Sequence, residues 1–261
     1  MKKLFVLIAA ACMTCTAAFA QTVKPFKEGE RAVFLGNSIT DGGHYHSYIW
    51  LYYMTRFPDM PIRVFNGGIG GDTAYDMNKR LDGDIFAMKP SVLMVTFGMN
   101  DSGYFEYNGD KPKEFGEQKY QESIKNYQQM EKRFKDLPDT RIVMVGTSPY
   151  DETVQLKENT PFKTKNETIK RLVEYQKESA AKNNWEFTDL NAPMTAINQQ
   201  YQQKDPTFTL CGSDRIHPDN DGHMVMAYLF LKAQGFVGKE VADVEINANK
   251  KQAVKSENCT I

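Results

Sequence analysis

Two kinds of segment alternate along this chain of 261 residues. Short apolar runs rich in β-branched and aromatic residues lie at 31–36, 62–66, 91–98, 141–146 and 185–190. Longer segments separate them, and in 117–136 hydrophobic residues recur at the three- and four-residue spacing of an amphipathic helix. The same spacing predicts helices over 164–183 and about 220–233, where Gly235 is a typical stop signal.

The alternation of strands and helices indicates an α/β protein. Strands joined through helices are parallel, and the crossover helices cover both faces of the sheet. Near-continuous apolar strands fit a sheet that is buried on both faces. We therefore predict a three-layer α/β/α sandwich with about five parallel strands, in a domain over 21–236 whose sandwich begins near residue 28. The polar stretch 237–261 is a C-terminal extension, either an extra hairpin or the start of a further segment.

The first twenty residues have the pattern of a leader rather than of a folded element. Two lysines precede a short apolar stretch, which ends in the small-residue pattern Ala-Phe-Ala. This predicts a signal peptide over 1–20, cleaved after Ala20, and therefore a secreted or periplasmic protein. A membrane anchor is disfavoured by the short apolar core, and lipoprotein cleavage before Cys12 by Ala9, where a larger aliphatic residue is usual. No later segment is apolar enough to span a bilayer.

Charge and cysteine content exclude several classes of function. The formal net charge is −1 without a basic block, so nucleic acid is not an expected partner. Two of the four cysteines lie in the leader, which leaves Cys211 and Cys259, paired or unpaired. No Cys-x-x-Cys pair remains outside the leader, so neither a structural zinc site nor another metal site is predicted.

Small polar residues follow three of the predicted strands and precede the last helix. These blocks are GNSIT at 36–40, NGGIGGDT at 66–73, GMND at 98–101 and DRIHP at 214–218. Ligands of open parallel sheets bind beyond the carboxyl ends of the strands. We therefore expect the four blocks to meet at one edge of the sheet.

The residue types in these blocks suit acyl transfer. A serine hydroxyl needs an adjacent base to become a nucleophile, and Ser38 is the serine of the first block. His217 follows Asp214 by three residues, so the carboxylate can hold Nδ1 of the imidazole and leave Nε2 free for the serine proton. Pro218 would rigidify the chain just after this base.

Donors for a developing oxyanion are available at the same strand ends. They are the backbone N–H groups of Ser38 and Gly71 and the side-chain amide of Asn100. Glycine at position 71 would let the backbone approach a substrate closely. Asp101 is interpreted as a structural or helix-capping carboxylate.

The four blocks resemble, in order and spread, those of the SGNH hydrolases, also called the GDSL family. The resemblance covers nearly the whole domain and implies a flavodoxin-like three-layer fold, in agreement with the alternation of elements. It implies catalytic roles for Ser38, Asp214 and His217 and an oxyanion hole formed by Ser38, Gly71 and Asn100. The chain departs from the family name at Asn37, where aspartate is expected, and this could alter how the turn is held.

Two further segments could contact a substrate. The long insertion after Asp101 carries Tyr104, Phe105 and Tyr107, which could stack on sugar rings or pack back onto the domain. His44 and His46 could line a pocket or lie on the surface, and no third ligand for a metal accompanies them. His223 is expected on the surface of the last helix.

These observations predict a secreted serine esterase that hydrolyses short acyl esters, acetyl esters in particular, on carbohydrate, without a cofactor. The substrate would be a small-molecule or glycan ester, and no stable membrane span is expected. The alternatives are a lysophospholipase or thioesterase of the same family and a non-catalytic carbohydrate-binding protein. Acyl length, the alcohol, the oligomeric state and any continuation beyond Ile261 are left open.

Overall fold

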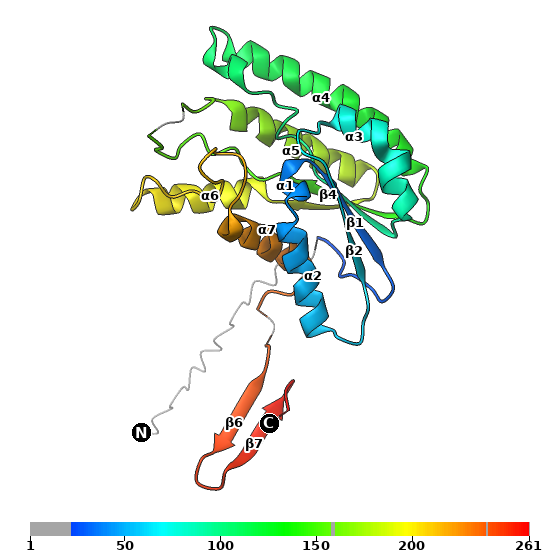
Figure 1. The fold of residues 1–261 in the computed structure, drawn as a ribbon, viewed down its shortest axis with the longest axis vertical. Helices are drawn as coiled ribbons and strands as arrows, with labels where there is room; N and C mark the ends of the chain where they lie inside the picture. Colours follow the sequence, from blue (N-terminus) through cyan, green and yellow to red (C-terminus); the bar gives the residue numbers. More distant parts are fainter. Residues whose placement is uncertain (1–21, 158–159, 239, 261) are drawn as a thin grey trace, which may run out of the picture.

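Five parallel strands form the central sheet of the computed structural model, which describes residues 22–157, 160–238 and 240–260 (Figure 1). The strands are β1 (Arg31–Gly36), β2 (Arg63–Gly68), β3 (Val92–Val95), β4 (Arg141–Gly146) and β5 (Glu186–Asp189). Their order in the sheet is β2-β1-β3-β4-β5. The predicted α/β class and parallel sheet are confirmed, and the predicted leader over 1–20 lies outside the described residues.

Helices cover both faces of this sheet (Figure 1). They are α1 (Ser38–Asp41), α2 (His44–Arg56), α3 (Ala74–Arg80), α4 (Pro112–Lys135), α5 (Lys165–Lys182), α6 (Asn191–Gln202) and α7 (Asn220–Ala233), with short turns η1 (Leu81–Ile85), η2 (Phe86–Met88) and η3 (Phe105–Asn108). On one face α2 and α7 bury Ile49 and Phe230 against Phe34 of β1. On the other face, α3 and α4 bury Met77 and Tyr127. No helix among the described residues is long and apolar enough to cross a membrane.

The register of the strands aligns their carboxyl ends. Gly36 at the end of β1 pairs with Gly68 of β2, and Leu35 pairs with Val95 of β3. β1, β3 and β4 are buried almost throughout, as their apolar sequences predict. Because β1 lies between β2 and β3, the segments that leave these three strands start side by side.

The boundaries of some elements differ from the predicted ones. α4 begins at Pro112 rather than 117, because proline fits the first turn of a helix, whose N–H groups have no partner within the helix. β2 continues through Gly68, and β3 ends at Val95 rather than at residue 98. α2, α3 and α6 were not among the predicted helices.

The C-terminal extension contains an antiparallel hairpin of β6 (Asp243–Asn247) and β7 (Gln252–Glu257). It extends away from the sandwich (Figure 1). An extra hairpin was one of the two expectations for this stretch. Cys259 lies exposed just after β7, and Cys211 is buried in the sandwich; both are free thiols.

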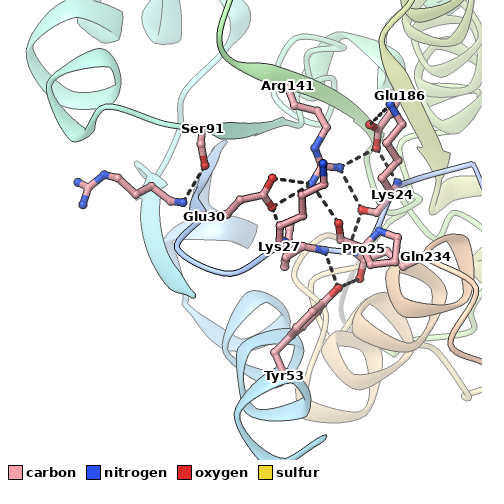
Figure 2. A network of polar contacts seen from close by, with 11 residues as sticks. Lys24, Pro25, Lys27, Glu30, Tyr53, Ser91, Arg141, Glu186 and Gln234 are labelled. Carbon is pink, nitrogen blue, oxygen red and sulfur yellow. Dashed lines mark hydrogen bonds and ion pairs between the residues drawn. The ribbon is translucent and has the colours of Figure 1, made fainter. Parts of the chain in front are cut away.

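A polar network closes the amino edge of the sheet, opposite the predicted site (Figure 2). Arg141 at the start of β4 donates to Glu186 at 2.9 Å, to Glu30 at 3.1 Å and to the backbone carbonyl oxygen of Lys24 at 3.0 Å. Arg141, Glu30 and Glu186 keep only 17%, 14% and 12% of their side-chain surface exposed. One guanidinium therefore holds the start of the described chain against two strands.

Replacement of this arginine should destabilise the protein strongly. Arg141→Met leaves the mostly buried Glu30 without its ion pair and Glu186 with only the exposed Lys24 at 4.0 Å, so we expect a loss of about 3 kcal/mol in the free energy of unfolding, measured in urea. Lys177→Met is the matched control, because its ion pair with Glu174 is more than half exposed, and it should cost less than about 0.5 kcal/mol. Equal losses for the two variants would contradict this account of the network.

Candidate active site

Ser38 is the first residue of the short helix α1, directly after β1. Asn37 caps this helix with its side-chain oxygen, which accepts a hydrogen bond from the backbone N–H of Ile39 at 3.1 Å. A Cβ on Gly36 would lie 2.1 Å from Oγ1 of Thr40, so only glycine allows the strand to turn here. Asn37, at the position of the family's aspartate, thus holds the turn through this cap, and Ser38 lies half-buried at the edge of the sheet.

A continuous hydrogen-bonded chain joins Ser38 to His217 and Asp214. Ser38 Oγ lies 2.7 Å from His217 Nε2, and His217 Nδ1 lies 2.5 Å from Asp214 Oδ2. The second oxygen of Asp214 accepts from the backbone N–H groups of Ile216 and His217, at 2.9 Å each. Because the carboxylate accepts from Nδ1–H, this network assigns Nε2 as the acceptor for the serine proton.

The turn that carries His217 is fixed by the buried residue between the two partners. Arg215 has a φ of 69°, in the left-handed region. Its guanidinium is buried and donates to the backbone carbonyl oxygens of Asp151, at 3.1 Å, and Val154, at 2.7 Å. Asp151 in turn donates its backbone N–H to the carbonyl oxygen of Arg215 at 3.0 Å. The segment after β4 therefore anchors the loop of the histidine.

Asp214 and His217 each stabilise the charged form of the other. The hydrogen bond and charge of Asp214 raise the pKa of His217 above its ordinary 6.5, against the opposite effect of partial burial. Partial burial alone would raise the pKa of Asp214, but the hydrogen bonds from His217 and Ile216 outweigh it and the pKa is lowered. Asp214 is thus ionised at neutral pH and stabilises an imidazolium next to Ser38.

The block after β2 lies against α1. A Cβ on Gly68 would come within 2.2 Å of the backbone nitrogen of Asp41, and the backbone N–H of Gly70 donates to the Asp41 carboxylate at 3.2 Å. Gly71 has a φ of 84°, and a Cβ there would meet no protein atom within 4 Å. Its backbone conformation is therefore the structural reason for glycine at 71, and the space beside it is open.

Asn100 joins the block after β3 to the block after β2. Its Nδ2 donates to the carbonyl oxygen of Asp72 at 2.9 Å. The carboxylate of Asp72 accepts from Arg80 at 2.6 Å, and Arg80 also donates to the carbonyl oxygens of Gly36, at 3.2 Å, and Gly67, at 2.8 Å. Arg80 of α3 thus joins the end of β1, β2 and the loop after β2 around the predicted oxyanion hole. The sequence gives no sign of this role, because Arg80 has the pattern of an ordinary helix residue.

Asp101 is a structural carboxylate, as predicted. It is buried and accepts from the backbone N–H of Ala74, at the start of α3, at 2.9 Å and from that of Gly98 at 2.9 Å. Ser123 of α4 donates to it at 3.0 Å. The residue next to Asn100 therefore fixes the loop to two helices.

The predictions for His46 and His223 are wrong, whereas Tyr107 packs back onto the domain, one of the two placements expected for it. Tyr107 is buried, and its hydroxyl donates to the carbonyl oxygen of Ser102 at 2.8 Å, so it is not available to a substrate. His46 is buried too, and its Nε2 donates to the carbonyl oxygen of Thr40 at 3.2 Å. His223 is 5% exposed rather than on the surface of the last helix. In each case the helix that carries the residue turns its side chain toward the protein interior.

The other rim candidates stay near the surface. Phe105 is 80% exposed, and Tyr104 is half-buried with its hydroxyl on Asn100. His44 is exposed and stacks on His223 with 5.0 Å between ring centroids. Among the described residues, the cluster that could hold a metal ion is Glu240, Asp243 and Glu257 on the C-terminal hairpin, where Lys255 already pairs with Asp243 and Glu257.

Comparisons with known proteins address the family and the fold of this chain. Residues 34–225 match the model of the GDSL-like lipase/acylhydrolase family. An acetylxylan esterase from Geobacillus stearothermophilus is 27% identical over 224 residues, which cover 80% of this chain and 95% of that protein. A solved structure of a catalytic mutant of such an esterase from the same organism is 24% identical with a TM-score of 0.64, over 81% of this chain and 96% of that one.

A second solved structure is much more similar. It is described as a gut microbial diltiazem-metabolizing enzyme, is 84% identical with a TM-score of 0.89, and covers 92% of this chain. The present chain spans 54% of the length of that protein. Because the family model matches well over half of the sequence, the chain belongs to the GDSL-like lipase/acylhydrolase family.

The different environments of the histidines predict different titrations. His217 should titrate above pH 6.5, because Asp214 stabilises its charged form. Burial and the neighbouring histidines lower the pKa of His223 to about 4. Imidazole resonances followed by NMR against pH should show both values, and Asp214→Asn should lower only the first one clearly. A His217 pKa at or below 6.5 in the unaltered protein would contradict the assigned hydrogen bond.

Proposed function

We propose that this chain is a serine esterase that removes short acyl groups, acetyl groups in particular, from carbohydrate. The observation that carries the proposal is the continuous chain of hydrogen bonds from Ser38 through His217 to Asp214, at 2.7 and 2.5 Å. The predicted leader would place the mature protein outside the cytoplasm, where polymeric glycans occur. No step below requires a cofactor.

The reaction begins with Ser38. Its oxygen attacks the ester carbonyl carbon while His217 Nε2 takes the hydroxyl proton. The negative charge that develops on the carbonyl oxygen is stabilised by the N–H of Ser38, the N–H of Gly71 and the amide of Asn100. The N–H of Ser38 suits this role because it lies in the first turn of α1, where N–H groups have no partner within the helix.

Collapse of the tetrahedral intermediate breaks the bond to the alcohol, and His217 gives its proton to the leaving oxygen. Water then attacks the acyl group on Ser38, His217 takes a proton from that water, and the carboxylic acid leaves as the serine regains its proton. Only the neutral imidazole can accept a proton, so activity falls as pH drops through the raised pKa of His217.

An acetylated carbohydrate substrate is supported by the relative and by the surroundings of the site. The Geobacillus relative is an acetylxylan esterase. The side chains of His217 and Asp214 keep 47% and 46% of their surface exposed, which leaves room for a bulky alcohol. Beside Asn100 lies a hollow of about 310 Å³, whose lining includes Thr73, Tyr75, Lys119, Lys125 and Asn126. Hydrogen-bonding groups around an aromatic ring suit a sugar.

A lipid substrate is less well supported. A long acyl chain needs an apolar channel that starts at the nucleophile. The large apolar groove, about 580 Å³, is instead lined by residues of α2, α7 and the segment after α7, and its lining does not include Ser38, Asn100 or His217. The hollow beside Asn100 is lined mainly by polar side chains.

Hydrolysis of p-nitrophenyl acetate, butyrate and octanoate tests the proposal. Acetate should be the best substrate, and Ser38→Ala should lower its turnover by about 10⁴-fold or more, because the nucleophile is lost. Circular dichroism and thermal unfolding serve as controls for the fold of the variant. Release of acetate is also measured from acetylated xylo-oligosaccharides and from diltiazem, which carries one acetate ester. These two substrates compare a sugar with a drug as the alcohol part of the ester. A preference for octanoate, or full activity in Ser38→Ala, would refute the proposal.

Tyr75 should matter for a glycan and not for a small ester. Its ring is 50% exposed at the hollow beside Asn100. Tyr75→Ala should raise KM about tenfold for acetylated xylo-oligosaccharides, because stacking on the sugar is lost, and leave p-nitrophenyl acetate within twofold. Tyr201→Ala, at a tyrosine of equal exposure on α6, is the matched control and should change neither value. Equal effects of Tyr75→Ala on both substrates would exclude a sugar subsite here.

A further inference from the structure

The amide of Asn100 is held from behind by a tyrosine of the long insertion. Tyr104 donates its hydroxyl proton to Asn100 Oδ1 at 2.5 Å. We propose that Tyr104 is a positioning residue for the oxyanion hole, which orients and polarises the Asn100 amide without touching the substrate. This inference rests on the proposed function and assigns to Tyr104 a role different from the sugar contact predicted from the sequence.

Two contacts determine which way the amide points. On one side, Nδ2 donates to the carbonyl oxygen of Asp72 at 2.9 Å. On the other side, Oδ1 accepts from Tyr104, whose pKa is raised by burial, so the hydroxyl keeps its proton at neutral pH. A flipped amide would bring its oxygen against the Asp72 carbonyl oxygen. Nδ2 of Asn100 carries two hydrogens, and one of them is donated to Asp72. The second hydrogen has no acceptor among the described residues and is free to bind a substrate oxygen.

A buried lysine holds the tyrosine and the loop together. Lys165 at the start of α5 is fully buried, and its Nζ lies 3.9 Å from the centroid of the Tyr104 ring. The same nitrogen donates to the carbonyl oxygens of Met99 at 2.7 Å and Gly103 at 2.5 Å, on either side of Asn100, and to Ser102 Oγ at 2.6 Å. The three donors of an ammonium group are thus all used within this loop. The backbone around Asn100 and the ring of Tyr104 therefore share one anchor.

The ring of Tyr104 also has an aromatic neighbour, besides Lys165. Its ring makes an edge contact with Phe162, with 5.9 Å between centroids. A donor aimed at a transition-state oxygen must be held within a fraction of an ångström to be effective. A hydrogen bond to Oδ1 also draws electron density from the amide, which makes the remaining N–H a stronger donor. Both effects favour the oxyanion over the ground-state ester.

Tyr104→Phe removes only the hydroxyl and keeps the ring contacts. It should lower kcat for p-nitrophenyl acetate about tenfold, the usual worth of one hydrogen bond, with KM within twofold. Tyr107→Phe is the matched control, because it removes a buried hydroxyl from the same loop that contacts Ser102 and Thr168 rather than Asn100. Its kcat should stay within twofold of the unaltered protein, even if its thermal stability falls.

A double-mutant cycle separates positioning from direct contact. In an Asn100→Ala background, Tyr104→Phe should have no further effect on kcat, because Tyr104 acts through the amide alone. A further tenfold loss there would show that Tyr104 touches the substrate, and an unchanged kcat for Tyr104→Phe alone would show that it plays no part. Either result overturns the proposal. Ser38→Ala is measured in parallel, since activity that survives it refutes the esterase mechanism itself, independently of Tyr104.

Discussion

The position of β1 between β2 and β3 determines where the proposed site forms. The chain leaves β1 toward β2 and returns to β3 on the other side, so the strand order reverses at β1. At such a point the loops after neighbouring strands separate and leave room for a ligand. Ser38 lies at this point, with Gly71 on the β2 side and Asn100 on the β3 side. Strand order brings the proposed nucleophile and the two proposed oxyanion donors together, although 33 and 62 residues of sequence separate Ser38 from them.

Buried or largely buried lysine and arginine side chains hold the loops that carry the proposed site residues. Lys165 anchors the loop of Asn100, and Arg215 anchors the loop of His217. Arg80 ties the ends of β1 and β2 to Asp72. Each of these side chains donates to backbone carbonyl oxygens in loops or at strand ends, and buried carbonyl oxygens need such partners. The reactive side chains can therefore stay accessible to solvent while the backbone beneath them is fixed.

The strands, the principal helices and the meeting of the four blocks could be predicted, because each leaves a local signal in the sequence. A buried parallel strand is continuously apolar, and the end of such a strand has a known place in the sheet. α2 gives no such signal, because its apolar residues lie on both sides: Ile49 is buried while Leu51 and Met54 are more than half exposed.

The direction of individual side chains could not be predicted. Tyr107 and Phe105 stand two residues apart in one insertion, yet one is buried and the other is 80% exposed. Lys165 has the sequence pattern of a solvent-facing lysine, and only the loop folded around it explains its burial. The roles of the site residues are proposals that rest on geometry, and measurements of activity test them.

Trapping the acyl-enzyme tests directly whether Ser38 is the nucleophile. The protein is mixed with p-nitrophenyl acetate, quenched with acid during turnover, digested and examined by mass spectrometry. We expect one added acetyl group on Ser38, absent from Ser38→Ala treated in the same way. Turnover of the ester with the acetyl group on another residue, and none on Ser38, would contradict this role for Ser38.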